Sequence, residues 1–301
     1  MPNLFSTTPK QLEKLALASP FAKSIFDKNP AAACDFLSEF SLSRPLNQSD
    51  FDSTLWQGQN LTDHENLFDN SEADIAKYLR QKRTYFMLKW IWQDALEMIC
   101  LEQLTFELSA FANSCIKFCK DYTYHTLCKR YGEPVIKKNG KTLNDEFAVV
   151  AMGKLGAMEL NLSSDIDLIF LHLADGETNG KKIIDNQKFM INLGRGMIRL
   201  LSEVSEFGFV FRVDMRLRPW GDGSALAISH VALEKYLSQH GREWERYAWI
   251  KARIITGGQD GDSLLDMTRP FVFRKYVDYT AFEAMREMKA MIEREVARRN
   301  I

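Results

Sequence analysis

Two aspartates separated by a single residue, Asp165 and Asp167, are the clearest sign of chemistry in the 301-residue sequence. They open the segment DIDLIFLHL (165–173), whose apolar run is typical of a buried β-strand. Side chains two positions apart in a strand point to the same face, so both carboxylates project together. Two such charges repel unless a cation lies between them, and carboxylate oxygens favour Mg²⁺ or Mn²⁺ over zinc. The pattern therefore predicts a divalent metal site.

A third acid stands in the segment FGFVFRVDMRLR (207–218), which alternates so regularly that it predicts another strand. One face is apolar, and the other carries Arg212, Asp214, Arg216 and Arg218. If this strand pairs beside the acidic one, Asp214 becomes a third catalytic and metal-binding carboxylate, with Arg216 and Arg218 as phosphate ligands. Three carboxylates, a metal and arginines predict phosphoryl or nucleotidyl transfer. A ladder of Asp–Arg salt bridges on a solvated sheet face is the alternative.

A glycine-bearing turn, Gly153-Lys154-Leu155-Gly156, follows a second apolar strand, FAVVAMG (147–153). Backbone N–H groups at a turn between a strand and a helical turn can cradle phosphate. The spacing matches neither a P-loop nor a dinucleotide-binding fingerprint, which excludes both as sequence-based assignments. Lys154 either neutralises a phosphate or caps the turn. Ser163 and Ser164 either contact phosphate or bond to the backbone beside the acids.

Helices dominate the first part of the chain. Apolar residues recur at helical spacing from residue 71 to 131, with Ser71 as the capping residue and Gly132 at the end. This stretch predicts two or three helices, with Trp90 and Trp92 in the core. We therefore expect an α+β fold that is mostly helical and carries its site on a small sheet.

The character of the sequence changes after residue 134, so we expect a helical region over 1–134 and a site-bearing region over 135–301. The latter opens with a polar stretch that contains an Asn139-Gly140 turn signal. Helices are expected over 185–205 and from about residue 230 to the end, and 249–257 is compatible with a further strand. The last helical segment has no stop signal of its own, so we expect the chain to continue beyond it.

Composition excludes several classes of protein. Lys plus Arg number 39 and Asp plus Glu 40, so the net charge of −1 disfavours a nucleic-acid binder. No apolar run is long enough to span a membrane, and no signal peptide is recognised, so we expect a cytoplasmic protein. The five cysteines form no C-x-x-C pair, and we interpret Cys115 and Cys119 as buried thiols rather than metal ligands.

Three strings together resemble the glutamine synthetase adenylyltransferase family: MGKLGAMELNLSSDIDLIF (152–170), FRVDMRLRPWGDG (211–223) and GREWERYAWIKARII (241–255). That family is bifunctional, and each half is built on a nucleotidyltransferase fold of the DNA-polymerase-β type. The resemblance implies that 135–301 is a nucleotidyltransferase-like catalytic region. Asp165, Asp167 and Asp214 match the family's three acids, and Gly153 matches its turn. Lys154 and Ala157 depart mildly from the superfamily pattern.

The wording of 241–253 and 269–299 is closer to the N-terminal, adenylyl-removing half of that family. The resemblance implies removal of AMP from adenylylated glutamine synthetase by Mg²⁺- or Mn²⁺-dependent phosphorolysis, with ADP as the product. It further implies glutamine synthetase, the PII signal protein, nucleotide and phosphate as partners.

Three other interpretations remain open: ATP-dependent adenylylation by the transferring half, a non-catalytic PII-responsive module, and an RNA- or antibiotic-modifying enzyme on the same fold. The presence of all three acids counts against a non-catalytic module. Neutral charge and the long family strings count against the RNA- or antibiotic-modifying enzyme.

Overall fold

The structure, a computed structural model, describes residues 14, 16–28, 44–58, 67–138, 141–273 and 279–298. The chain divides into two compact units, each assembled from several segments. The helical unit consists of Met1–Phe118, Met158–Ser164 and Leu200–Val210, and the mixed unit consists of Cys119–Ala157, Asp165–Arg199 and Phe211–Ile301. The regions 1–134 and 135–301 were inferred from composition along the chain, and they stay a prediction about domains.

The helical unit is built around long, tightly packed helices. Its elements are α2 (Pro20–Lys28), α4 (Gln48–Trp56), the short 3-10 helix η1 (Leu67–Asp69), α5 (Glu72–Ala95) and the first part of α6 (Leu101–Tyr131). Ser71 caps α5 by accepting a backbone hydrogen bond from the first turn at 3.2 Å, as predicted. Trp90 and Trp92 are buried, which confirms them as core residues. The Trp90 ring packs against Phe86 and Phe111, with centroids 5.7 and 5.8 Å apart.

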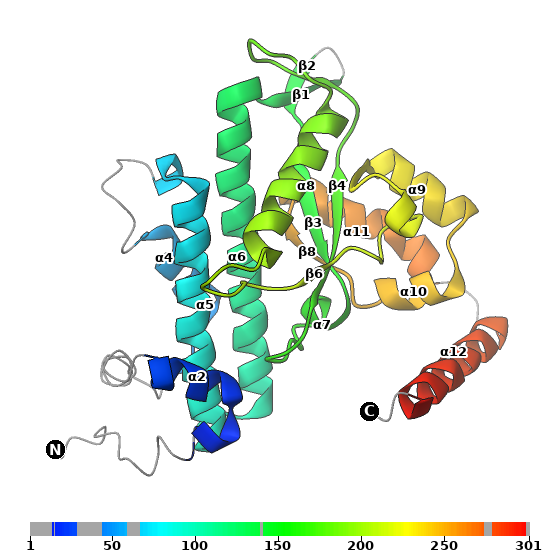
Figure 1. Cartoon of the computed structure of the whole chain (residues 1–301). Coiled ribbons are helices and arrows are strands. Elements are labelled where there is room, and N and C mark those ends of the chain that lie inside the picture. The colour runs from blue at the N-terminus through cyan, green and yellow to red at the C-terminus, as the bar shows by residue number, and fades with distance from the viewer. Residues whose placement is uncertain are drawn as a thin grey trace. The chain divides into compact units, whose positions relative to one another are not determined.

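The mixed unit alternates strands and helices, which Figure 1 colours from green to red. Its strands are β1 (Pro134–Lys138), β2 (Lys141–Asn144), β3 (Phe147–Ala151), β4 (Ile166–His172), β5 (Glu177–Thr178), β6 (Val213–Asp214), β7 (Ala227–Ser229) and β8 (Arg253–Thr256). Its helices after α6 are α7 (Gly153–Gly156), α8 (Asn186–Ser202), η2 (Gly221–Gly223), α9 (His230–Gln239), α10 (Glu243–Trp249), α11 (Gly258–Val272) and α12 (Tyr279–Arg298). The architecture is therefore α+β, as expected.

The larger sheet has the strand order β6-β4-β3-β8, and β7 also pairs with β4. Strands β3 and β4 are antiparallel, whereas β6 and β7 both run parallel to β4. A smaller sheet of order β2-β1-β5 lies elsewhere in the same unit. The strands predicted over 147–153 and 165–173 are present as β3 and β4. Strand β4 is thus central to the sheet, because it pairs with β3, β6 and β7.

Helices cover both faces of the larger sheet. Alternate residues of β3 and β4, among them Val150 and Ile169, share a core cluster with residues of α9 and α11. On the other face, Phe170 lies so close to α8 that a Cβ atom on Gly194 would be 2.7 Å from its ring. This burial on both faces explains why β3 and β4 have nearly continuous apolar sequences. Within the described residues, no helix combines the length and the apolarity needed to cross a membrane.

One predicted element is wrong. The strand expected over 207–218 is reduced to the two residues of β6, and turns begin right after it. Beyond Asp214 the strand is limited by competition for one edge of β4, because β7 pairs there with Phe170–His172. The helix expected over 185–205 is present as α8, and part of 249–257 forms β8. The Asn139-Gly140 turn lies outside the described residues, although β1 and β2 on either side of it pair antiparallel.

Candidate active site

The acidic pair lies at the start of β4. Asp165 immediately precedes the strand, and its side chain is 47% exposed. Asp167 is the only residue of β4 that is not fully buried. Because one residue separates the two along an extended backbone, both carboxylates project from the same face of the sheet edge.

Asp214 joins this pair through the pairing of β6 with β4. The two strands are parallel, and Asp214 is directly opposite Asp167 in the register. The Asp214 side chain is mostly buried, with 14% of its surface exposed. The structure therefore brings the third acid beside the first two, as the alternation of the sequence led us to expect, while the roles of the three acids remain predictions.

The three carboxylates differ in their electrostatic environment. Burial raises the pKa of Asp167, and the neighbouring charges of Asp214 and Asp165 raise it further. In contrast, hydrogen bonds from Arg216 hold the pKa of Asp214 below its usual range. Asp167 is thus a half-buried carboxylate that faces two others, and a bound cation would relieve this repulsion.

Two arginines already form ion pairs with Asp214 and Asp165. The guanidinium of Arg216 donates to both carboxylate oxygens of Asp214, with Nε–O distances of 2.8 and 3.1 Å. Arg212 forms an ion pair with Asp165, a partner that the sequence analysis placed on this face without assigning it to the site. The side chains of Arg212 and Arg216 are 56% and 76% exposed, so both pairs can exchange with solvent or a ligand. These ion pairs resemble the ladder of Asp–Arg salt bridges considered as the alternative to a metal site. A simple ladder does not account for the repulsion of Asp167 by Asp214 and Asp165.

Arg218 lies differently from the position predicted for it. It follows the strand within a turn, and its side chain is only 10% exposed. Its Nη1 atom donates to the carbonyl of Met215 at 2.7 Å and to Asp222 at 3.1 Å. Arg218 therefore holds the loop after β6 in shape, and Arg216 is the exposed cation beside the acids.

The glycine turn contacts the acidic pair directly. Gly153 has φ +55°, a left-handed conformation that glycine adopts without strain, and a Cβ atom there would lie 2.7 Å from an Asp167 carboxylate oxygen. The backbone N–H of Met152 donates to the carbonyl of Asp167 at 2.9 Å, which fixes the turn against β4. Lys154 is exposed on the single turn of α7. The close approach explains why this position of the chain requires glycine.

Ser163 and Ser164 take part in a local turn just before the acids. The Ser164 hydroxyl donates to the side-chain oxygen of Asn161 at 2.6 Å, and the Ser163 backbone N–H donates to the same atom at 3.3 Å. Of the two roles considered from sequence, the structure shows the bond to the backbone for Ser164, whose hydroxyl accepts from the Asn161 N–H at 3.4 Å. Binding of phosphate by either serine stays a prediction.

The donor set fits a hard divalent cation. All three candidate ligands offer carboxylate oxygens, which Mg²⁺ and Mn²⁺ prefer, and Asp167 gains most from a nearby positive charge. Within the described residues, no three His, Cys, Asp or Glu side chains converge as ligands as they stand, because Asp165 and Asp214 turn toward arginines. Ligation by all three would require them to exchange arginine for metal. Cys115 and Cys119 are buried, as predicted.

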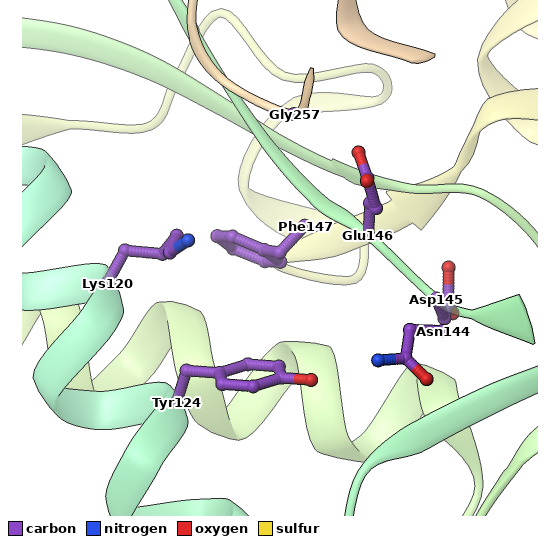
Figure 2. Close-up of a pocket in the computed structure, with 7 residues that line it drawn as sticks. All are labelled: Lys120, Tyr124, Asn144, Asp145, Glu146, Phe147 and Gly257. Carbon is purple, nitrogen blue, oxygen red and sulfur yellow. The ribbon is translucent and has the colours of Figure 1, made fainter. Parts of the chain in front are cut away.

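A pocket of about 260 Å³ lies at the opposite end of β3. Figure 2 shows the side chains of Lys120, Tyr124 and Phe147 on one side of it and those of Asn144 and Asp145 on the other. None of the predicted site residues lines this pocket. We call the edge of β4 that carries Asp165, Asp167 and Asp214 the acidic edge. The acidic edge and the pocket are therefore separate features of the same sheet.

A family model described as glutamate–ammonia ligase adenylyltransferase matches residues 9–265, which include the acidic edge and the glycine turn. The chain belongs to this family. Its sequence is 59% identical over 246 residues to a bifunctional glutamine synthetase adenylyltransferase/adenylyl-removing enzyme of Acinetobacter baylyi. That match covers 79% of this chain and 26% of the relative.

Other members of the family are similar over comparable lengths. The enzyme of the same name from Thioalkalivibrio sulfidiphilus is 41% identical over 97% of this chain and 29% of its own length. The one from Pseudomonas aeruginosa is 45% identical over 76% of this chain and 23% of its own length. The chain thus spans less than a third of the length of these relatives.

Proposed function

We propose that this chain removes AMP from adenylylated glutamine synthetase by metal-dependent phosphorolysis, in the cytoplasm and under the influence of the PII signal protein. The observation that carries the proposal is the register of Asp167 with Asp214, with the Gly153 turn against the same carboxylate. The names of the relatives support glutamine synthetase as the protein substrate. The sequences of 241–253 and 269–299 resemble the adenylyl-removing half of the family more than the transferring half, which supports removal of AMP.

The reaction joins two phosphates. An oxygen of orthophosphate attacks the adenylyl phosphorus, the bond from phosphorus to the tyrosyl oxygen breaks, and that oxygen leaves with the electron pair and takes up a proton. ADP and free tyrosine result. The difficulty is electrostatic, because a phosphate anion must approach a phosphodiester that is already negative.

The residues of the acidic edge are suited to that difficulty. Asp165, Asp167 and Asp214 would hold Mg²⁺ or Mn²⁺, which neutralises the adenylyl phosphate and stabilises the leaving oxygen. Arg216 now pairs with Asp214, and its guanidinium would be available to bind phosphate oxygens if that carboxylate served as a cation ligand. Gly153 lets the backbone approach closely at this point, and Arg218 fixes the loop that carries Arg216.

The test is the product formed by the 301-residue chain. Incubation with adenylylated glutamine synthetase, Mg²⁺ and phosphate should release ADP, measured by chromatography. Asp214→Asn should abolish release, whereas Asp266→Asn, which changes an exposed acid of α11 that pairs with Arg269, should not affect it. Release of AMP by water, ATP-driven adenylylation of unmodified glutamine synthetase, or no reaction would each contradict the proposal.

A further inference from the structure

The loop between β6 and β7 is rooted at the acidic edge. Both strands pair with β4 in parallel, β6 opposite Asp167 and β7 from Phe170 onward. Residues 215–226 therefore leave the edge of β4 immediately after Asp214 and return to the same edge three positions further on. Both ends of this loop are thus anchored on the strand that carries Asp167.

The loop presents one large aromatic side chain. Trp220 is 54% exposed, although an indole is normally largely buried in a folded protein. Its backbone has φ +60°, in the left-handed region that bulky residues rarely adopt. Strained residues of this kind persist where the surrounding structure holds them, and they cluster at ligand sites.

The surroundings of Trp220 do hold it. The ring of Tyr236 on α9 packs against the indole with centroids 4.5 Å apart, and the His240 ring lies 6.5 Å away. The Tyr236 hydroxyl donates to the buried carboxylate of Glu245 on α10 at 2.5 Å, which fixes the supporting ring. Arg218 clamps the loop two residues before the indole. Trp220 is thus an exposed aromatic surface on a rigid base.

We propose that Trp220 stacks on the purine base of the nucleotide whose phosphate is bound at the acidic edge. The inference rests on the proposed function and names how the nucleoside part is held. A cation held by the carboxylates and the arginine beside them would bind phosphate oxygens, whereas an indole face stacks on any base. Because the interaction is with a π-face, it contributes affinity for the base and little discrimination among purines.

The test is binding of ADP and of pyrophosphate to the 301-residue chain with Mg²⁺, measured by calorimetry. Trp220→Ala should weaken ADP binding about 5- to 150-fold, the range for loss of one stacked base, and leave pyrophosphate affinity unchanged. Trp220→Phe should keep most of the ADP affinity. Trp244→Ala is the matched control, because Trp244 is a 39% exposed tryptophan on α10 outside the loop, and it should bind ADP normally.

The outcomes separate this inference from the proposed function. Unchanged ADP affinity in Trp220→Ala, with ADP binding still lost in Asp167→Asn, would overturn the stacking role and leave the phosphate site intact. An equal loss of ADP and pyrophosphate binding in Trp220→Ala would show that the indole only shapes the loop, which also overturns it. Failure of the unaltered chain to bind either ligand would overturn both proposals.

Discussion

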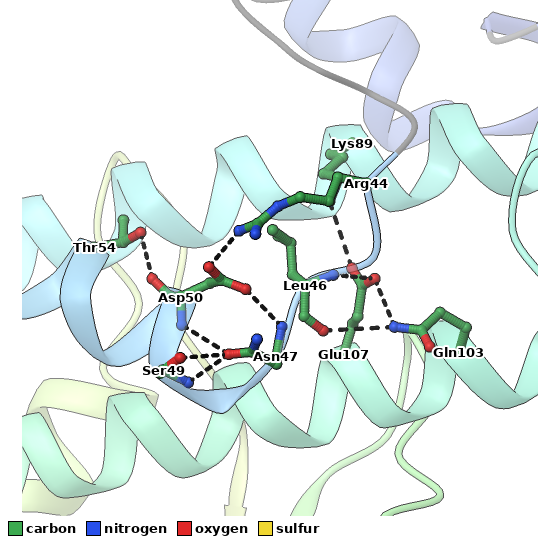
Figure 3. A network of polar contacts seen from close by, with 9 residues as sticks. All are labelled: Arg44, Leu46, Asn47, Ser49, Asp50, Thr54, Lys89, Gln103 and Glu107. Carbon is green, nitrogen blue, oxygen red and sulfur yellow. Dashed lines mark hydrogen bonds and ion pairs between the residues drawn. The ribbon is translucent and has the colours of Figure 1, made fainter.

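The helical unit and the acidic edge both contain carboxylates away from bulk water, but they treat them in opposite ways. In the helical unit Glu107 is fully buried and every interaction around it is favourable (Figure 3). It accepts hydrogen bonds from Trp90 Nε1 at 2.8 Å, Leu46 N at 2.9 Å and Gln103 Nε2 at 2.9 Å, and it lies 3.5 Å from the buried Lys89 ammonium. This carboxylate is a structural group with its partners built in.

At the acidic edge the compensation is incomplete. Asp167 faces two other carboxylates, and the arginines that pair with those two are largely exposed. A buried charge without a full set of partners lowers the stability of the fold. The same charge would attract a cation, so this arrangement favours ligand binding at the expense of stability. Removing a charge should therefore have opposite effects on stability in the two regions.

The largest expected effect concerns activity at the acidic edge. Asp167→Asn should lower the rate of ADP release by more than about 10³-fold, because it removes the central carboxylate of the cation site. The same variant should unfold at a higher temperature than the unaltered chain, because it removes the cost of burying the Asp167 charge and the repulsion with Asp214 and Asp165. Calorimetric unfolding without added metal measures the second effect, and a lower melting temperature would contradict the comparison.

The matching change in the helical unit should destabilise the protein. Lys89→Met leaves the buried Glu107 without its cationic partner, which should cost about 3 to 5 kcal/mol of unfolding free energy. The double variant Lys89→Met/Glu107→Gln should recover part of this loss, because a neutral side chain needs no cationic partner and its one amide oxygen can still accept from Leu46 and Gln103, while the hydrogen bond from Trp90 is lost. Urea unfolding of the three proteins checks the prediction, and a double variant no more stable than the single one would argue against a charge effect.

A third test separates the exposed arginine from an ordinary surface ion pair. Arg216→Ala should slow ADP release about 10²- to 10³-fold, the loss expected when one donor to the transition state is removed, and raise the phosphate concentration needed. Its thermal stability should change little, because the Arg216 side chain is 76% exposed. Arg269→Ala removes a comparably exposed arginine, paired with Asp266, and serves as the control. Equal rates in both variants would reduce Arg216 to a salt-bridge partner.

The sequence predicted the acidic edge better than the loop that follows it. Strands β3 and β4 are buried on both faces, so their apolar runs signal them unambiguously. The alternation after residue 207 continues past Asp214 but the strand does not, because β7 occupies the remaining edge of β4. Local bonds compete as well: the Arg216 backbone N–H donates to the Asp214 side chain at 2.8 Å. Competition among strands for one edge of a sheet depends on tertiary structure, so it cannot be predicted from the alternation of apolar and polar residues in the sequence.

The exposure of Trp220 illustrates the same limit. Nothing in the sequence around Trp220 predicts that its side chain is exposed, and only the glycine that follows points to a turn with a left-handed backbone. Its support comes from Tyr236, sixteen positions along the chain. The sequence therefore predicted the three acids of the site, and the structure was needed to suggest Trp220 as the surface proposed to bind the base.

A fourth prediction concerns a buried charge of the mixed unit that resembles Glu107 more than Asp167. His172 Nε2 lies 3.0 Å from the Gln187 side-chain oxygen, whose orientation is fixed because Gln187 Nε2 donates to the carbonyl of Ala227 at 2.6 Å. His172 Nδ1 lies 3.3 Å from Asp145. Both ring nitrogens thus face acceptors, which favours the imidazolium.

Burial alone would lower the pKa of His172, but the hydrogen bonds and charge of Asp145, together with Gln187, outweigh it and raise the pKa above its usual value. A raised folded-state pKa means that the stabilisation is complete below the ordinary histidine pKa of about 6.5 and disappears as pH rises through the folded-state value. His172→Gln should therefore cost about 1.5 to 3 kcal/mol at pH 6, the worth of a hydrogen bond to a charged group, and distinctly less at pH 9. Urea unfolding at both pH values measures the difference, with His240→Gln, an exposed histidine of the same unit, as the control. A cost that stays constant between the two pH values would show that His172 is neutral in the fold and that Asp145 is held by its other partners, Asn186 and the Leu173 backbone.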